Sequence, residues 1–391
     1  MHPTETNTRF LISWGLSKSI VIIGPAYPLR GGLSTYNQLL AIKLQEQGHS
    51  VRIVTFSLQY PSVLFPGKTQ YSTDPSPQNI DIEVSLNSVN PLNWWSIGNR
   101  LKKEKPDLVI LRYWMPFMGP CLGTVSRLVR KNSHTKVVTI ADNIIPHEKR
   151  FFDTPFTKYF VKSCDGFVTM SESVLEDLKQ FDMSKPSAYN PHPMYESFGE
   201  QIDKTDARRS IGIDENGKYL LFFGFIRKYK GLDILLKAFA DSRIQEAGIK
   251  LIIAGEYYDS SEEYQSIIKS YKLEKAIVQV NDFIPDSEVS AYFSAADMVV
   301  QTYKTATQSG VTQIAYYYHK PMLVTDVGGL AELVPHNKVG YVTSTDIKEI
   351  ADSILDFYQN NREVEFIENI KTERNRFTWN SMIEKLFEVG S

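Results

Sequence analysis

Short apolar runs alternate with amphipathic stretches along the chain. Ser19–Gly24 (SIVIIG) is rich in β-branched residues and has no internal polar residue, which is typical of a strand buried on both faces. The next stretch, Leu33–Gln47, repeats apolar residues on one helical face and ends before a glycine, so it predicts a helix. Val51–Phe56 predicts a second strand. Together they predict a βαβ unit with parallel strands and a right-handed crossover.

The same alternation continues and predicts two α/β domains of the Rossmann type. Further strands are expected at Leu108–Leu111, Val137–Ile140, Gly166–Met170, Tyr219–Gly224, Lys250–Gly255, Ile277–Val280, Met298–Gln301, Met322–Thr325 and Val339–Val342. Three prolines in residues 185–199 (KPSAYNPHPMYESFG) interrupt the pattern and predict a linker there.

We therefore expect an N-terminal domain at 1–190, a C-terminal domain at 191–375, and a final helix at 376–391 that packs back towards the first domain. Open parallel sheets bind ligands at the carboxyl ends of their strands. The loops that follow the strands are therefore the places to look for a site, in a cleft between the two facing domains.

Composition fits a soluble globular protein. The 391 residues are 42% hydrophobic and 23% charged, and a chain of this length exceeds one ordinary core. No apolar run reaches the roughly 20 residues that span a bilayer, and residues 1–20 lack the pattern of a signal peptide. Only Cys121 and Cys164 are present, which predicts no disulfide framework and favours a cytoplasmic setting.

The charge is unevenly distributed. Residues 1–190 hold 21 Lys+Arg against 15 Asp+Glu, a charge of +6. Residues 191–391 therefore carry −8, and the two parts add up to the net charge of −2. Basic segments at 100–105, 126–131 and 147–150 could meet an acidic acceptor or the anionic inner face of a membrane, as a peripheral contact. The alternative is that they are solvated helical faces. No nucleic-acid partner is expected.

Two loops carry candidate chemistry for binding phosphate. Gly31 and Gly32 directly precede a predicted helix, where backbone N–H groups and the helix dipole favour an anion, although a tight turn could need the same glycines. Arg227, Lys228 and Lys230 lie between a strand and a helix and could neutralise a diphosphate leaving group. The alternative for these cations is an ordinary surface loop.

Four segments of the second half, in their order along the chain, resemble the signature of one enzyme family. They are GFIRKYKGLDILLKAF (224–239), LIIAGEY (251–257), NDFIPDSEVSAYFSAADMVVQ (281–301) and KPMLVTDVGGLAELV (320–334). The Gly31-Gly32 pair after the first strand resembles the family's glycine-rich donor loop. The chain is thereby identified as a member of the retaining glycosyltransferases of the GT-B fold, family four of the usual classification, also described as glycosyltransferases group 1.

This resemblance implies transfer of a sugar, with retention, from a nucleoside diphosphate sugar to an acceptor hydroxyl, without a metal or another cofactor. It implies that Arg227 and Lys230 bind the donor diphosphate and that the backbone at Ile284 pairs with the base. The amides of Ser309, Gly310 and Val311 would contact the phosphates, and a Ser-Gly turn ahead of an apolar helix suits that role, with a simple helix cap as the alternative. Family habits and the basic first domain suggest a bacterial surface polysaccharide or a lipid-linked glycan as acceptor.

The sequence departs from the family pattern in the second domain. Phe225 stands where the family has the arginine of its "GR" pair, so Arg227 must reach the phosphate from a shifted position or share the task with Lys228. The family's two glutamates, of which the second usually holds the ribose, fall at Ala306 and Ile314. Gln308 or Gln313 could supply neutral hydrogen bonds instead.

A third departure lies in the first domain, where Ala141 replaces a histidine that is frequent in the family. His147, with Asp142 and Glu148 close by, is the available substitute. It is predicted to act on the transferring sugar or the acceptor hydroxyl, although a lone histidine is more often structural or exposed.

Two alternatives to the transferase remain from the sequence. One is another enzyme of this architecture, a nucleotide-sugar epimerase or a sugar phosphorylase; the other is a non-catalytic nucleotide- or sugar-binding subunit. The sequence has no Asp-x-Asp and no zinc motif. A P-loop is excluded because Ser62 stands where its first glycine would be.

Overall fold

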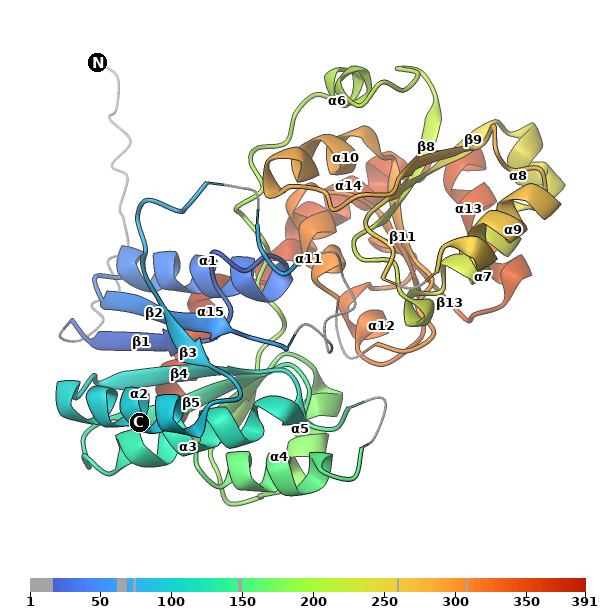
Figure 1. Ribbon diagram of the computed structural model, residues 1–391. Coiled ribbons are helices and arrows are strands. Elements are labelled where there is room, and N and C mark those ends of the chain that lie inside the picture. Colours follow the sequence, from blue (N-terminus) through green and yellow to red (C-terminus); the bar gives the residue numbers. More distant parts are fainter. Residues whose placement is uncertain (1–16, 62–68, 73–74, 147–149, 259, 307–308) are drawn as a thin grey trace, which may run out of the picture.

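The structure is a computed structural model, and it describes residues 17–61, 69–72, 75–146, 150–258, 260–306 and 309–391. Two α/β domains face each other, each with one parallel sheet sandwiched between helices (Figure 1). The prediction of two Rossmann-like domains is confirmed.

The first sheet has seven strands in the order β3-β2-β1-β4-β5-β6-β7, all parallel. Its strands are β1 (Ser19–Ile23), β2 (Ser50–Leu58), β3 (Asp81–Asn87), β4 (Leu108–Tyr113), β5 (Lys136–Ala141), β6 (Gly166–Thr169) and β7 (Ser187–Tyr189). Its helices are α1 (Gly32–Glu46), α2 (Pro91–Glu104), α3 (Gly119–Arg130), α4 (Asp153–Val161) and α5 (Glu172–Lys179).

The second sheet has six strands in the order β10-β9-β8-β11-β12-β13, again all parallel. Its strands are β8 (Lys218–Phe223), β9 (Ile249–Ala254), β10 (Ile277–Val280), β11 (Met298–Gln301), β12 (Met322–Thr325) and β13 (Gly340–Thr343). The helices around it are α6 (Lys204–Ser210), α7 (Leu232–Phe239), α8 (Ser242–Glu246), α9 (Glu262–Ser270), α10 (Val289–Ala295), α11 (Gly310–Tyr317), α12 (Leu330–Leu333), α13 (Ile347–Gln359) and α14 (Glu363–Glu373).

Central strands of both sheets are buried along their whole length because helices cover both faces. Every residue of β4 is buried, and β11 and β12 are buried throughout. The edge strand β3 differs: it reads DIEVSLN, alternates polar and apolar residues, and is largely half-buried or exposed. That pattern follows from its having a neighbour on one side only.

The linker is shorter than the sequence predicts. Residues 187–189 of the predicted linker form β7, which pairs with β6 as the edge of the first sheet. The crossing to the second domain therefore begins after Tyr189. A three-residue edge strand between prolines has too little apolar pattern to be recognised from sequence.

The chain returns to the first domain through α15 (Trp379–Val389). This helix packs beside β6 so closely that a side chain at Gly166 would overlap the carbonyl of Val389. The Trp379 ring lies 4.9 Å from the Tyr36 ring of α1, and its Nε1 donates to the carbonyl of Met194 in the linker (3.0 Å). The first domain is therefore built from two separate stretches of chain, its N-terminal part and α15. Trp379 of α15 also hydrogen-bonds the linker at Met194.

Candidate functional site

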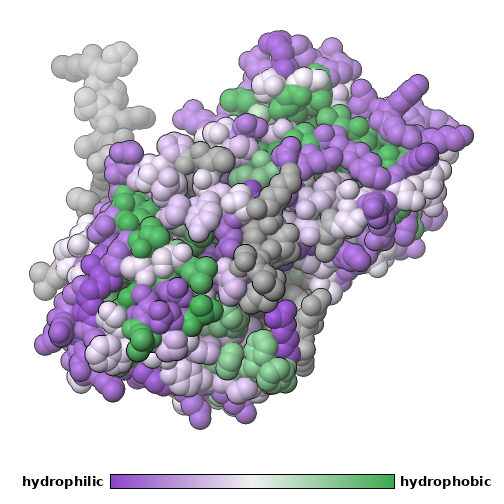
Figure 2. Space-filling model, viewed as in Figure 1, coloured by the Kyte–Doolittle hydropathy of each residue, from purple (hydrophilic) through white to green (hydrophobic). Residues whose placement is uncertain are grey.

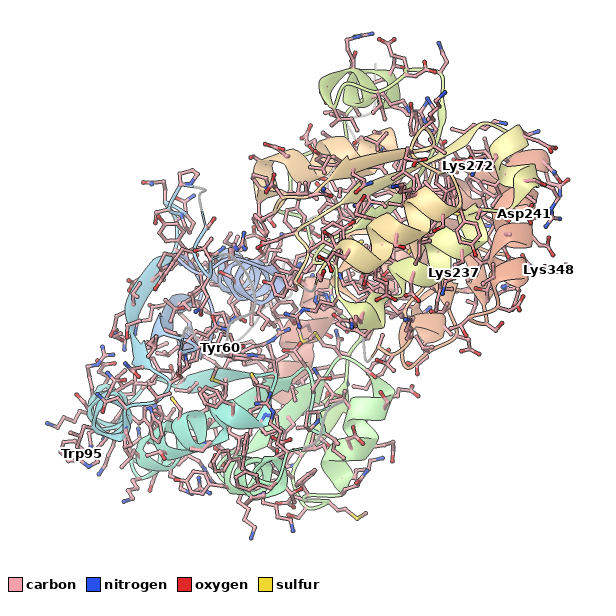
Figure 3. The ribbon with its side chains drawn as sticks, turned by 45° about the vertical axis from the view of Figure 1, so that its right-hand side comes forward. Tyr60, Trp95, Lys237, Asp241, Lys272 and Lys348 are labelled. Carbon is pink, nitrogen blue, oxygen red and sulfur yellow. The ribbon has the colours of Figure 1, made fainter. Side chains whose placement is uncertain are left out.

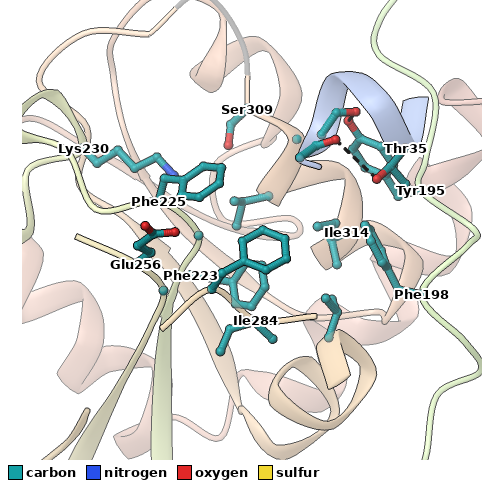
Figure 4. Close-up of a pocket in the computed structure, with 18 of the residues that line it drawn as sticks. Thr35, Tyr195, Phe198, Phe223, Phe225, Lys230, Glu256, Ile284, Ser309 and Ile314 are labelled. Carbon is teal, nitrogen blue, oxygen red and sulfur yellow. Dashed lines mark hydrogen bonds between the residues drawn. The ribbon is translucent and has the colours of Figure 1, made fainter. Parts of the chain in front are cut away.

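A cavity of about 240 Å³ lies between the domains, at the carboxyl ends of both sheets (Figure 4). This is the position at which open parallel sheets bind ligands. The first domain contributes the start of α1, and the second contributes the loops after β8 to β11 and the start of α11. The lining residues that bear on its chemistry are Gly31, Gly32, Thr35, Tyr195, Phe198, Phe223, Phe225, Tyr229, Lys230, Glu256, Ile284, Asp286, Val289, Tyr303, Ser309, Gly310, Val311 and Ile314.

Lys230 is the buried cation of this cavity. It ends a 3₁₀ turn, Lys228–Lys230, and is only 8% exposed. Its amine has no ion-pair partner within the described part of the chain. Burial, and secondarily the neighbouring Arg227, lower the pKa of Lys230 to about 7. An anion placed beside this amine would therefore restore its charge.

Two glycines allow the Lys230 turn to sit where it does. Gly224 has φ 90°, and a Cβ there would approach the Lys230 Nζ to 3.1 Å. Gly231 has φ 67°, and a Cβ there would overlap the carbonyl of Thr302. Both positions need backbone conformations that L side chains rarely adopt, so the loop after β8 depends on glycine.

Arg227 and Lys228 lie outside the cavity lining. Arg227 is half-buried, with its guanidinium carbon 4.5 Å from the centre of the Tyr258 ring, and Lys228 is exposed. Of the predicted cations, Lys230 is therefore the one that lines the cavity, whereas Arg227 acts on it through its charge.

The start of α11 forms the wall beside Lys230. Gly310 and Val311 line the cavity, and Ser309 is the N-cap residue. The Ser309 hydroxyl lies 3.2 Å from the Tyr303 hydroxyl and does not cap the helix, so within the described part of the chain no side chain caps the first-turn N–H groups. Free N–H groups at a helix start favour an anion. This wall and Lys230 together suit a phosphate.

The glycine pair lies on the opposite wall, in the first domain. Gly31 has φ 102°, and Gly32 begins α1. The Tyr195 hydroxyl of the linker donates to the Gly32 carbonyl (3.0 Å). The predicted residue Ile284 also lines the cavity, with 6% exposure.

An ion pair across the cleft joins the two domains at this cavity. The Arg30 guanidinium donates to the Glu256 carboxylate at 2.5 Å, and the two side chains are 8% and 1% exposed. The same guanidinium carbon lies 4.3 Å from the Phe283 ring centre. Thr35 also lies within 3.3 Å of an Asp286 oxygen. Sequence reasoning missed this interdomain pair, because the partners are 226 residues apart.

The histidine predicted to act on the acceptor side of the first domain has no described position. His147 and Glu148 lie outside the described residues. Asp142, which follows β5, is buried and makes a bidentate pair with Arg112, with both N···O distances 2.6 Å. The guanidinium carbon of Arg112 also lies 3.9 Å from the Tyr36 ring centre.

A second histidine that the sequence analysis did not single out lies beside this pair. His192 of the linker is 3% exposed, and its Nδ1 lies 2.6 Å from the Pro193 carbonyl. Burial, and then the charge of Arg112, lower the pKa of His192 to about 3, so the ring is neutral at physiological pH. It packs edge-on against Tyr36 at 4.9 Å.

The two positions of the family glutamates are apolar in space as well as in sequence. Ile314 lines the cavity, and Ala306 is 8% exposed. Gln313 is fully buried and is not among the residues that line the cavity. Gln308 lies outside the described residues.

The described residues contain no group of three or more His, Cys, Asp or Glu side chains that could hold a metal ion. Within the same residues, no helix has both the length and the apolar character required to cross a membrane.

Comparison with known proteins places both halves of the chain in one class. The family model described as "Glycosyl transferases group 1" matches residues 203–373. The model described as "Glycosyltransferase Family 4" matches residues 30–189. The two matches fall on the two domains and contain the cavity-lining loops.

Curated relatives agree with these family models. The D-inositol 3-phosphate glycosyltransferase of Pseudarthrobacter chlorophenolicus is 30% identical over 140 residues, which cover 35% of this chain and 33% of the relative. The N-acetyl-alpha-D-glucosaminyl L-malate synthase of Bacillus anthracis is 21% identical over 345 residues, 84% of this chain and 85% of the relative.

Solved structures share the fold over almost the whole chain. HepE of Anabaena, in complex with UDP, superposes with a TM-score of 0.72 at 15% identity, covering 95% of this chain and 98% of that one. WaaG, a glycosyltransferase involved in lipopolysaccharide biosynthesis, gives a TM-score of 0.68 at 17% identity, covering 95% and 99%. At these identities the likeness concerns the fold alone.

Proposed function

Because the chain belongs to the group 1 glycosyltransferases, we propose that it moves a sugar, with retention, from a nucleoside diphosphate sugar to an acceptor hydroxyl. The donor would occupy the cavity between the domains, mainly against the second one. The acceptor would approach from the first domain, where His147 stays the predicted residue for the transferring sugar or the acceptor hydroxyl.

The observation that carries this proposal is the pairing of Lys230 with the start of α11. Among the described residues, a buried amine without an ion-pair partner and helix N–H groups without a side-chain cap face one cavity. Negative charge builds on the leaving diphosphate as the glycosidic bond breaks, and fixed cations and N–H dipoles in a dry site stabilise it. Arg227 adds a second positive charge just outside the lining.

The contacts across the cleft support transfer over hydrolysis. The Arg30–Glu256 pair joins the domains at the cavity, and closure around a donor would exclude water from the reacting sugar. The carboxylates that line the described cavity, Glu256 and Asp286, both contact first-domain side chains. We therefore favour same-face attack guided by the leaving phosphate, without a covalent enzyme intermediate or a metal.

Three measurements separate the alternatives. Free nucleoside diphosphate as a product distinguishes transfer from epimerisation, and dependence on inorganic phosphate would mark a phosphorylase. A non-catalytic subunit would bind the donor and release nothing.

A thermal-shift screen tests the donor site. We expect one of UDP, GDP, ADP or TDP, or a sugar conjugate of it, to raise the melting temperature by about 5 °C at 100 times its Kd. Nucleotides with the other bases should change the melting temperature little. If none of the nucleotides stabilises the protein, the proposal that this cavity binds a nucleoside diphosphate donor fails.

We also propose a peripheral contact between the first domain and an anionic membrane, which would suit a lipid-linked acceptor. On the outer face of α2, Leu92 and Trp95 are 79% and 63% exposed, and Lys103 and Lys105 follow at its exposed end. Trp95 lies at the far end of this domain from the second one (Figure 3). Apolar groups lie between hydrophilic ones on this domain's surface (Figure 2). Apolar side chains beside lysines suit an anionic lipid surface.

Vesicle co-sedimentation tests this contact. We expect binding to vesicles of phosphatidylglycerol and phosphatidylcholine, little binding to phosphatidylcholine alone, and about tenfold weaker binding after Leu92→Ser with Trp95→Ala. Val364→Ser removes an apolar side chain of similar exposure (72%) from the second domain and serves as the control. Equal binding of the double variant and the wild type would contradict the contact.

A further inference from the structure

An aromatic side chain lies at the open edge of the cavity between the domains. Tyr229 lines this cavity, and yet 41% of the residue is exposed to solvent. The other two tyrosines among the described lining residues, Tyr195 and Tyr303, are 4% and 3% exposed. Tyr229 therefore presents an uncovered surface at the place where a ligand of the cavity meets solvent.

The Tyr229 ring is held beside the residues proposed to bind the diphosphate. It belongs to the same 3₁₀ turn as Lys230, and its carbonyl accepts a hydrogen bond from the N–H of Lys304 (2.7 Å). The ring packs edge-on against Tyr303, with the ring centres 6.0 Å apart. The Lys230 Nζ lies 5.6 Å from the centre of the same Tyr303 ring, whose hydroxyl contacts Ser309. Tyr303 thus joins the Tyr229 ring, the Lys230 amine and the start of α11 into one corner of the cavity.

The covalent structure of a nucleoside diphosphate sugar determines which part of it reaches this corner. Its two uncharged parts, the nucleoside and the sugar, are joined to opposite ends of the diphosphate. Phe198, Ile284 and Ile314 line the side of the cavity away from Lys230 and suit the nucleoside (Figure 4). With the diphosphate held at Lys230, the sugar then lies at the open edge beside Tyr229, where an acceptor hydroxyl can reach it.

Stacking is the contact that an aromatic ring offers to a sugar. The face of a sugar ring carries weakly positive C–H groups, whereas the face of an aromatic ring is negative. Packing the two faces together also removes apolar surface from water. Resting on the proposed function, we infer that Tyr229 stacks on the transferring sugar. The contact adds to the affinity for the sugar-bearing donor and leaves the affinity for the bare nucleoside diphosphate unchanged.

A comparison of ligands with and without the sugar isolates this contact. The ligands are UDP, GDP, ADP and TDP, each beside its glucose and galactose conjugates, titrated by calorimetry into the whole chain. For the conjugate that binds, we expect Tyr229→Ala to raise the Kd about tenfold, the size of one aromatic contact. The Kd of the corresponding bare diphosphate should stay within about twofold of the wild-type value.

Two further variants serve as controls. Tyr229→Phe keeps the ring and removes the hydroxyl, so it should bind the conjugate like the wild type. Tyr271→Ala removes another exposed tyrosine of the second domain, 52% exposed and outside the cavity lining, and should change neither Kd. Thermal unfolding of each variant establishes that it is folded before the affinities are compared.

The outcomes separate this inference from the proposed function. If Tyr229→Ala weakens the bare diphosphate as much as the conjugate, or changes neither, the inference is overturned while the donor site stands. If Tyr229→Phe loses as much as Tyr229→Ala, the hydroxyl makes the contact and stacking is overturned. If the bare diphosphate binds but no conjugate does, the sugar has no place beside Tyr229. If nothing binds the wild type, the donor site itself is wrong and the inference falls with it.

Discussion

Lys230→Ala is expected to lower kcat/KM for sugar transfer by about 100-fold to 1000-fold, the usual effect of removing one group that stabilises developing negative charge. The amine is buried and lines the cavity beside the start of α11, where the leaving diphosphate would lie. Transfer is measured as nucleoside diphosphate released, and the same variant should lose the thermal stabilisation by nucleotide. The fold should persist, because the side chain makes no ion pair within the described residues.

Lys237→Ala is the matched control for this variant. Lys237 lies on α7, seven residues further along, and its side chain is 40% exposed and away from the cavity. Its replacement should leave both transfer and nucleotide binding near the wild-type values. An unchanged rate in Lys230→Ala, or an equal loss in Lys237→Ala, would contradict the role assigned to Lys230.

The lowered pKa of Lys230 gives the same experiment a pH dependence with a definite sign. In the empty site the amine titrates near pH 7, and a bound diphosphate favours its charged form and so raises that pKa. Binding therefore takes up a proton at pH 8 to 9, and nucleotide affinity falls as pH rises above about 7. Calorimetry in Tris and in HEPES at one pH measures the uptake, which should vanish in Lys230→Ala.

The folding stability of the nucleotide-free protein depends on pH in the opposite direction to the nucleotide affinity. An unfolded Lys230 would keep its proton up to about pH 10.5, so the unfolded state binds more protons than the folded state between pH 7 and that value. The contribution of this residue to stability therefore increases as pH rises from about 7.

Asp142→Ala is expected to lower the free energy of unfolding of the first domain by about 3 to 5 kcal/mol. The variant leaves the Arg112 guanidinium, 2% exposed, without the carboxylate that accepts two of its hydrogen bonds. Its Nη1 already lacks a partner among the described residues, so little else can compensate. Urea unfolding followed by tryptophan fluorescence measures the loss, with the two domains fitted as separate transitions where they separate.

The double variant Arg112→Met with Asp142→Leu is the control for that measurement. Replacing both partners by apolar side chains of similar size removes the buried charge together with its partner, and such exchanges are often close to neutral. We expect the double variant to be more stable than Asp142→Ala alone. If Asp142→Ala costs less than about 1 kcal/mol, the pair is not the buried, solvent-excluded contact described above.

The sequence predicts the central parts of both sheets well, because strands buried on both faces read as unbroken apolar runs. It does not reveal β3 or β7. The first alternates polar and apolar residues at an edge, and the second has three residues between prolines. Both depend on pairing with a neighbour more than on local pattern, so their sequences alone do not distinguish them from loops.

The residues of the site also differ in whether the sequence alone could predict them. Lys230 and Gly310 could be predicted as cavity residues because each belongs to a local motif between a strand and a helix, whereas Ile284 is named only through the family resemblance. The Arg30–Glu256 pair could not, since only the approach of two domains brings these residues together. Arg112 left a local signal: it is an arginine inside the buried strand LVILRY, where a charge requires a partner.

The return of α15 to the first domain also sets an order of events during synthesis. Residues 204–373 of the second domain are contiguous and can fold as soon as they are made. The first domain lacks the helix that packs beside β6 until residues 379–389 exist, so its apolar sheet face stays open while the second domain forms. The domain that begins first is thus completed last, and a nascent chain that stalls in between exposes that face to chaperones.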